Sequence, residues 1–330
     1  MANSMFVAWL TFAAVLLAAL VLLCVALVFL MARTLLRPQR MTDARAIVIL
    51  KRLSPMDLGL PFEELSFNVR DERAGKPLKL AAWWIPSNGS TRTMLLLHGY
   101  ADAKVGAIAW APTLHSLGWN ILAIDLRAHG ESEGVHSTAG FYERQDTNQL
   151  VNQFRAMHPR ETQTFAIFGV SLGAAVAVAT AAMRDDIAAV ILESPFADYR
   201  RAVAAHGKIR GAPEGFLRDL AITLAERISA ADFRAVRPAL LIAQVKCPVM
   251  LIHAGDDPFI SHDDATAFEA ALIARQNPLD VRWSIAAGHV LGLAVDMNEY
   301  RDRVGAFLRG TGASPVQTTS SQHERGAHAT

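Results

Sequence analysis

A serine between two glycines is the first candidate nucleophile in this 330-residue chain. Gly169, Ser171 and Gly173 form a Gly-x-Ser-x-Gly pattern, preceded by an apolar run over 165–168 and followed by a small-residue run over 172–183. These runs predict a strand, a one-residue hinge and a helix in one tight corner, where the serine is strained and flanking side chains would collide with neighbouring elements. Such a turn lifts the hydroxyl above the sheet edge, and the helix start points free N–H groups at developing negative charge.

A serine hydroxyl is a poor nucleophile near neutral pH, so it needs a base that a third group orients. In enzymes with this kind of turn the chain order is serine, acid, histidine. The histidines after the last plausible acid are His262, His289, His323 and His328. His262 opens a helix beside two aspartates, and the last two lie in a polar tail, so we predict that His289, in Ala-Gly-His-Val directly after the last strand, is the base.

Two adjacent aspartates compete for the role of the acid. Asp256 and Asp257 follow a predicted buried strand over 249–253, and adjacent residues cannot easily face the same imidazole. We predict Asp257, which stands just before Pro258, as the acid. Asp256 remains the alternative for the acid. If it is not the acid, we expect its side chain to bind the backbone within a turn.

The oxyanion of the tetrahedral intermediate needs two backbone N–H groups that are already in place. One is predicted at Leu172, directly after the nucleophile. The second is predicted at Tyr100, because Gly99 allows a tight bend after the short strand over 93–97. His98 precedes the serine in the chain, so a structural hydrogen-bonding role is predicted for it.

The elements that must position these groups alternate between strand and helix. This rhythm predicts an α/β fold, a mostly parallel sheet flanked by helices over residues 62–310, with a hairpin at its start. Residues 196–245 are rich in Arg and Ala and delay the next strand by about fifty residues, which predicts an inserted helical cap. Residues 311–330 have the composition of a disordered tail. We expect strands over 64–70, 78–85, 93–97, 120–125, 165–168, 189–192, 249–253 and 281–285, and helices over 105–117, 141–157, 172–183, 263–276 and 298–308.

The N-terminal residues 1–32 are predicted to be a transmembrane anchor. The run 6–31 carries no charge, and at a rise of ~1.5 Å per residue it exceeds the ~30 Å hydrocarbon core. A cleaved signal peptide fits less well, because no basic residue precedes the run and no clear cleavage site follows it. Residues 33–61 read as a juxtamembrane linker. The positive-inside rule then places the catalytic domain in the cytoplasm at the cell membrane, because the flanking charges all follow the run: Arg33, Arg37, Arg40, Arg45, Lys51 and Arg52.

The overall composition argues against several classes of partner. The net charge is +1 and 19% of residues are charged, so no nucleic-acid partner is predicted. Two cysteines cannot build a disulfide framework, and no metal-ligand spacing occurs near them. The cap carries five basic residues that either meet an acidic headgroup or carboxylate, or form solvated helix faces: Arg200, Arg201, Lys208, Arg210 and Arg218.

Five stretches in order resemble α/β-hydrolases of the serine aminopeptidase-like and Bem46-like group. They are His-Gly-Tyr at 98–100, Asp-Leu-Arg-Ala-His-Gly-Glu-Ser-Glu-Gly at 125–134, Gly-Val-Ser-Leu-Gly at 169–173, Gly-Asp-Asp-Pro at 255–258 and Gly-His at 288–289. Ala128 stands where the family usually has Gly. Asp125, Arg127 and His129 are expected to fasten the loop after their strand.

The resemblance implies hydrolysis of an ester, thioester or amide, without metal or organic cofactor, and it does not fix the substrate. The predicted anchor favours a lipid acyl substrate, and a small-molecule acyl substrate is the alternative. The main hypothesis is therefore a membrane-anchored serine hydrolase that works through an acyl-enzyme. The alternative is a non-catalytic hydrolase-fold protein that binds a partner or lipid at the membrane. Neither the bond type nor the oligomeric state follows from the sequence, because one scaffold carries many chemistries.

Overall fold

The structure, a computed structural model, describes residues 2–312, so the predicted tail lies almost wholly outside the described residues. One eight-stranded sheet has the order β1-β2-β4-β3-β5-β6-β7-β8. β1 and β2 form the predicted hairpin, β2 also pairs antiparallel with β4, and all other pairs are parallel. The predicted fold class is confirmed. The strands are β1 (Glu63–Arg70), β2 (Pro77–Ile85), β3 (Arg92–Leu97), β4 (Asn120–Ile124), β5 (Thr164–Val170), β6 (Ala189–Glu193), β7 (Val249–Ala254) and β8 (Val281–Ile285).

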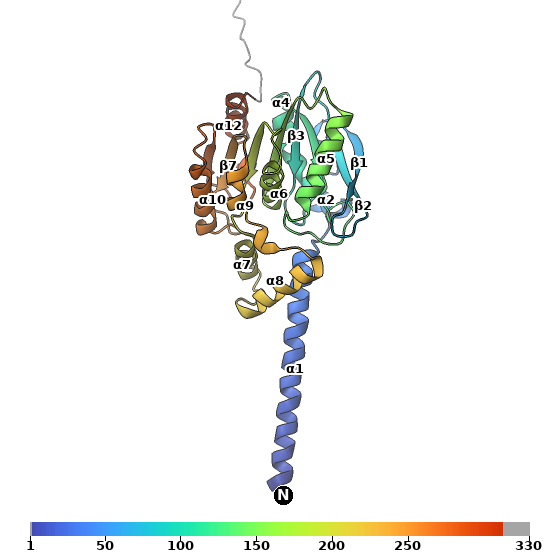
Figure 1. Ribbon diagram of the computed structural model, residues 1–330, viewed down its shortest axis with the longest axis vertical. Helices are drawn as coiled ribbons and strands as arrows, with labels where there is room; N and C mark the ends of the chain where they lie inside the picture. The colour runs from blue at the N-terminus through green and yellow to red at the C-terminus, as the bar shows by residue number, and fades with distance from the viewer. Residues whose placement is uncertain (1, 313–330) are drawn as a thin grey trace, which may run out of the picture.

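Helices cover both faces of this sheet (Figure 1). In β3, Leu95 and Leu97 face one buried cluster, whereas Met94 and Leu96 face the other, so the strand is apolar along its whole length. The helices are α1 (Ala2–Leu36), α2 (Asp43–Leu50), α3 (Lys104–Ala107), α4 (Ala111–Ser116), α5 (Glu143–Met157), α6 (Leu172–Ala181), α7 (Tyr199–Ile209), α8 (Phe216–Ser229), α9 (Pro238–Leu241), α10 (His262–Ala274), α11 (Gly292–Val295) and α12 (Met297–Gly310).

The helix expected over 105–117 is not continuous. α3 ends at Ala107, a 3-10 turn spans Ile108–Trp110, and α4 begins at Ala111. Pro112 explains the break, because a proline ring clashes with the carbonyl four residues earlier and offers no N–H. Pro112 is tolerated in the first turn of α4, because the backbone N–H groups there have no partner within the helix.

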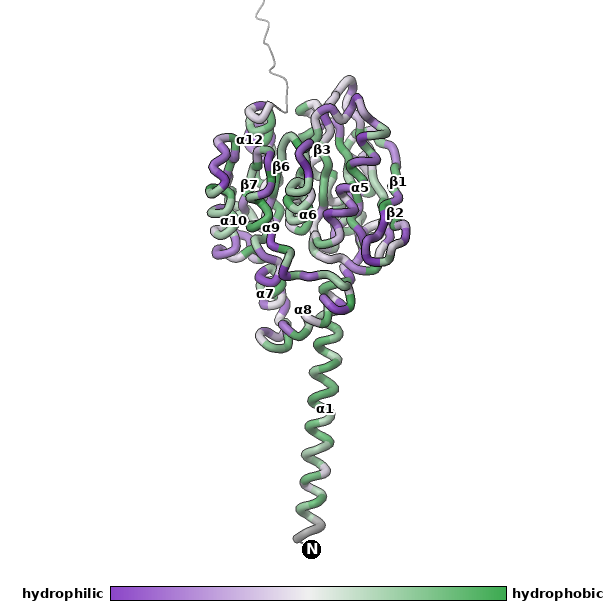
Figure 2. Tube along the Cα trace, in the orientation of Figure 1, coloured by the Kyte–Doolittle hydropathy of each residue, from purple (hydrophilic) through white to green (hydrophobic). Residues whose placement is uncertain are grey.

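The helix α1 continues past residue 32 to Leu36, and its C-terminal end packs on the domain. Among residues 2–312 it is the one helix long and apolar enough to cross a membrane. It projects from the domain, and its hydrophobic residues extend along it (Figures 1 and 2). Near its C-terminal end, Val28, Ala32 and Leu36 are buried. After it, Arg40 donates hydrogen bonds to main-chain carbonyls within 129–134, which fixes this segment against the domain.

The residues predicted to form a cap fold as helices between β6 and β7. α7 and α8 lie outside the layers around the sheet, beside the C-terminal end of α1 (Figure 1). α8 contacts α1. The cap and the N-terminal helix, which are far apart in the sequence, therefore meet on one side of the domain.

Candidate active site

The tight corner between β5 and α6 has the geometry expected for a nucleophile turn. Ser171 has φ 52° and ψ −113°, a strained backbone conformation for a residue other than glycine. A Cβ on Gly169 would lie 2.3 Å from the carbonyl oxygen of Gly173, in the helix. A Cβ on Gly173 would lie 2.1 Å from the carbonyl oxygen of Leu97, in β3. Both glycines are thus required by close backbone approach, as predicted.

The side chains of Ser171 and His289 meet, although 118 positions separate them in the chain. The His289 Nε2 lies 2.9 Å from the Ser171 Oγ, and the His289 Nδ1 lies 2.7 Å from the Asp257 Oδ2. A carboxylate can only accept, so Nδ1 carries the proton and Nε2 of the neutral ring is free to accept from the serine hydroxyl. This arrangement allows the ring to remove a proton from the serine oxygen.

Asp257, rather than Asp256, faces the imidazole. Its side chain is 1% exposed, and its Oδ1 accepts hydrogen bonds from the N–H groups of Phe259 and Ile260 at 2.8 and 3.0 Å. Burial would raise the pKa of Asp257, but the hydrogen bonds and charge of His289 and these two N–H groups outweigh it and lower the pKa below its usual value. The carboxylate therefore stays ionised beside the ring. Asp256 is exposed.

The two predicted oxyanion donors, Tyr100 and Leu172, line the same cavity as Ser171. A Cβ on Gly99 would lie 3.6 Å from the Ser171 Cβ, so the loop after β3 runs close past the nucleophile. Leu172 is the first residue of α6, where backbone N–H groups have no partner within the helix. The Tyr100 hydroxyl donates to the carbonyl of Thr34 in α1. No sequence pattern indicated that contact.

His98 is a structural residue in this geometry. Its Nδ1 lies 2.7 Å from the carbonyl oxygen of Gly99, and its Nε2 accepts from the N–H of Leu126 at 3.0 Å. Burial lowers the pKa of His98 to about 4, so the ring is neutral near pH 7. Both ring nitrogens are occupied, and they tie the loop after β3 to the loop after β4.

The motif after β4 closes on itself through buried polar contacts. Asp125 accepts from the N–H and the Nζ of Lys104 at 2.6 and 2.8 Å. Arg127 binds both carboxylate oxygens of Asp146, and His129 Nδ1 lies 2.9 Å from the Arg127 carbonyl oxygen. Ala128 has φ 63°, a region that favours glycine, which accounts for the glycine usual in the family at this position.

A buried carboxylate behind the site was missed from the sequence. Glu193, the last residue of β6, accepts from the Tyr300 hydroxyl at 2.6 Å, from Trp110 Nε1 at 3.2 Å and from the N–H of Gly292 at 3.0 Å. Its carbonyl also accepts from the N–H of Ser171 at 2.9 Å. It therefore holds the nucleophile turn and the segment after His289 together. The sequence did contain a signal for this role, because Glu193 is the one charged residue in an otherwise apolar strand.

The site opens into a cavity of about 300 Å³, large enough for a small-molecule site. Residues of the cap, of the loop after β3 and of α1 line it. Of the five basic cap residues, Arg210 and Arg218 belong to this lining. His206 of α7 also lines it and stacks on Phe259, whose ring meets His289 edge-on.

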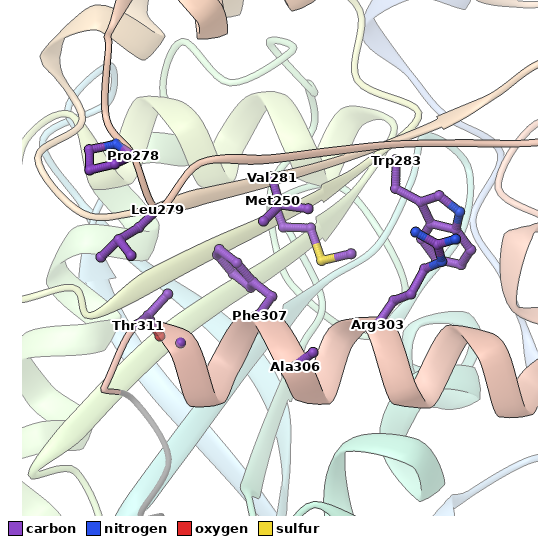
Figure 3. Close-up of a pocket in the computed structure, with 10 residues that line it drawn as sticks. Met250, Pro278, Leu279, Val281, Trp283, Arg303, Ala306, Phe307 and Thr311 are labelled. Carbon is purple, nitrogen blue, oxygen red and sulfur yellow. The ribbon is translucent and has the colours of Figure 1, made fainter.

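A second cavity, of about 350 Å³, lies between the sheet edge and α12 (Figure 3). Its walls are mainly apolar, from Met250, Phe307 and Trp283, and the Arg303 guanidinium lies 5.0 Å from the Trp283 ring centroid. The described residues that line it include no histidine and no carboxylate, so it offers no acid or base. We therefore assign the chemistry to the cavity at Ser171.

Known proteins resemble this chain in sequence and in fold. The family model described as serine aminopeptidase, S33, matches residues 89–231, which include Ser171 and end before Asp257. Protein YqkD of Bacillus subtilis is 25% identical over 235 residues, which are 69% of this chain and 75% of that protein. Lysophosphatidylserine lipase ABHD12 of Danio rerio is 30% identical over 190 residues, or 55% of this chain and 48% of that protein.

A solved structure gives the same result for the fold. The esterase Pf2001 of Pyrococcus furiosus superposes with a TM-score of 0.67 at 25% identity, covering 83% of this chain and 99% of the esterase. The sheet order, the nucleophile turn and these relatives show that the chain has the α/β-hydrolase fold and resembles the serine aminopeptidase-like proteins of that superfamily.

Proposed function

We infer that the protein is a membrane-anchored serine hydrolase that cleaves an ester, thioester or amide through an acyl-enzyme. The observation that carries this proposal is the continuous chain of contacts from Ser171 Oγ through His289 to Asp257, at 2.9 and 2.7 Å. Esterase and lipase relatives support hydrolysis as the reaction class.

The proposed reaction has two halves. Ser171 Oγ attacks the carbonyl carbon of the substrate while His289 Nε2 takes the hydroxyl proton, and the N–H groups of Tyr100 and Leu172 receive the negative oxygen. The imidazolium then gives its proton to the leaving group as the bond to it breaks. In the second half, water gives a proton to His289 Nε2 and attacks the acyl carbon; the bond between that carbon and Ser171 Oγ then breaks, the imidazolium returns its proton to Oγ, and the acid leaves. Asp257 stabilises the imidazolium in both halves.

Labelling with a fluorophosphonate probe tests the nucleophile. The full-length protein in detergent should be labelled at Ser171, and Ser171→Ala should abolish the labelling. The matched control is Ser229→Ala, a buried serine at the end of α8, which should be labelled like the wild type. Folded wild-type protein that takes up no probe, or undiminished labelling of Ser171→Ala, would refute the proposal.

The alternative is a binding protein with this fold and no turnover. Hydrolysis of p-nitrophenyl acetate distinguishes the two functions, because the alternative predicts no Ser171-dependent product. The short distance between Ser171 and His289 favours the enzyme, since a binding protein has no need for a base at hydrogen-bond distance from a strained serine.

We also infer that α1 anchors the protein in the cell membrane with the hydrolase domain on the cytoplasmic side. The charge-free run of the helix and the arginines that follow it support this orientation. Alkaline phosphatase fused after residue 60 reports the side directly, because that enzyme is active only outside the cytoplasm. We expect low phosphatase activity of the fusion. High activity would show that the hydrolase domain lies outside the cytoplasm.

A further inference from the structure

We propose that the last turns of α1 form a wall of the substrate cavity, so that the substrate is an acyl compound with one long alkyl chain, drawn from the membrane. This inference rests on the proposed function, because the bound chain is the acyl group that Ser171 would accept. It gives α1 a role in substrate binding in addition to anchoring.

The first step is the position of the α1 side chains. Leu30, Met31, Thr34 and Leu35 line the same cavity as Ser171. They are spaced at i, i+1, i+4 and i+5, so they share one face of the helix. Three of the four are apolar. A substrate whose carbonyl lies at Ser171 can therefore extend its chain along this face.

The second step is the character of the remaining walls. Phe196, Tyr199 and Val203 line the cavity from the cap side and add apolar surface. Three charged cap residues also border it, and all are exposed or only partly buried: Arg210, Glu214 and Arg218. An apolar interior with charges toward the solvent suits a molecule with an alkyl chain and a polar head.

The third step is the depth at which the cavity lies relative to the membrane when α1 spans it. A hydrocarbon core of ~30 Å takes roughly 20 helical residues, and the charge-free run ends at Met31, two residues before Arg33. The residues 30–35 therefore lie at the membrane surface when α1 spans the bilayer. The cap helix α8 contacts α1 and lies beside its C-terminal end (Figure 1), and it carries the exposed side chains of Phe216 and Leu220, with exposed fractions of 77% and 42%. Large exposed apolar side chains at this level are suited to contact with lipid.

The fourth step is the fixed position of this wall. The Tyr100 hydroxyl donates to the Thr34 carbonyl at 2.5 Å, and the N–H of Ser137 donates to the Leu36 carbonyl at 2.8 Å. The side chain of Ala32 is fully buried. Since Tyr100 is also a predicted oxyanion donor, the membrane helix and the reacting centre share one rigid contact.

The test compares substitutions on two faces of α1 in the full-length protein. Met31→Trp fills the cavity wall, and Phe29→Trp places the same side chain on an exposed position outside the lining. The substrates are p-nitrophenyl acetate in solution and p-nitrophenyl palmitate in phosphatidylcholine vesicles. We expect Met31→Trp to lower kcat/KM for the palmitate at least about tenfold more than it lowers kcat/KM for the acetate, and Phe29→Trp to leave both within about twofold.

A second variant keeps the test decisive if the tryptophan disturbs folding. Leu35→Ala removes side-chain volume from the same wall and so enlarges the cavity. The p-nitrophenyl ester with the highest kcat/KM should then have a longer acyl chain than for the wild type. Equal loss of both substrates in Met31→Trp, or an unchanged chain-length preference in Leu35→Ala, would overturn the chain-binding role while leaving the serine hydrolase intact. Wild-type protein that neither hydrolyses acetate nor takes up a fluorophosphonate would instead refute the proposed function.

Discussion

The substitution Asp257→Asn isolates the electrostatic contribution of the acid. The Asn Oδ1 can keep the hydrogen bonds from Phe259 and Ile260, which leaves the side-chain NH₂ group facing His289 Nδ1. Two donors cannot face each other, so the ring changes to the tautomer with the proton on Nε2, directed at Ser171. A ring in that state cannot accept the serine proton.

The size of the effect follows from the lost charge. A unit charge about 4 Å from the imidazolium, at an effective dielectric constant of about 20, contributes about 4 kcal/mol. That free energy corresponds to a loss of about 10³-fold in kcat. Stability should fall by only about 1–2 kcal/mol, because the backbone hydrogen bonds to the side chain are retained.

The assay is hydrolysis of p-nitrophenyl acetate, with thermal unfolding measured in parallel. Asp256→Asn is the matched control, since it makes the same change one residue earlier on an exposed side chain, and it should keep kcat within about twofold. A kcat for Asp257→Asn within about tenfold of the wild type would refute the reasoning. An equal loss in Asp256→Asn would move the acid to that residue.

Three further predictions concern stability. Gly173→Ala should cost about 3 kcal/mol or more, since its Cβ would lie 2.1 Å from the Leu97 carbonyl oxygen; an unchanged Tm would contradict this close approach. Arg127→Met should cost about 3–5 kcal/mol because it leaves Asp146 buried and unpaired, and denaturant unfolding should show that adding Asp146→Leu recovers part of the loss. Burial lowers the pKa of His98 to about 4 from 6.5, so between these values the unfolded chain binds a proton that the folded chain does not, and stability falls on acidification. The stability advantage of the wild type over His98→Asn should shrink by about 2 kcal/mol from pH 7 to pH 5, and a constant difference would show that His98 is not buried in its neutral form.

Much of the reacting centre was predictable because local rules fix it. The two glycines beside Ser171 follow from close backbone approach, and the choice of His289 follows from strand order, because loops at the carboxyl ends of parallel strands meet at one sheet edge. The hydrogen bonds that His289 makes with Asp257 and with Ser171 have the geometry that this reasoning predicts.

The unpredicted features depend on packing between distant segments. Nothing in a uniformly apolar helix indicates which face docks, so the burial of Ala32 and Leu36 was not foreseen. The contacts of Arg40 with distant carbonyls and of Glu193 with Tyr300 join elements far apart in the chain, and no short pattern records them. The break in the helix near Pro112 follows from the proline alone, whereas the apolar run around it indicates one continuous helix.

The direct passage of α1 into the domain has a consequence for kinetics. Only residues 37–39 separate Leu36, the last residue of α1, from Arg40, which is hydrogen-bonded to the domain, so an anchor at α1 would hold the domain at a constant height over the leaflet. For a protein anchored in this way, substrate arrives by lateral diffusion, and its mole fraction in the lipid sets the rate. Diluting the substrate with inert phospholipid at constant bulk concentration will then slow turnover.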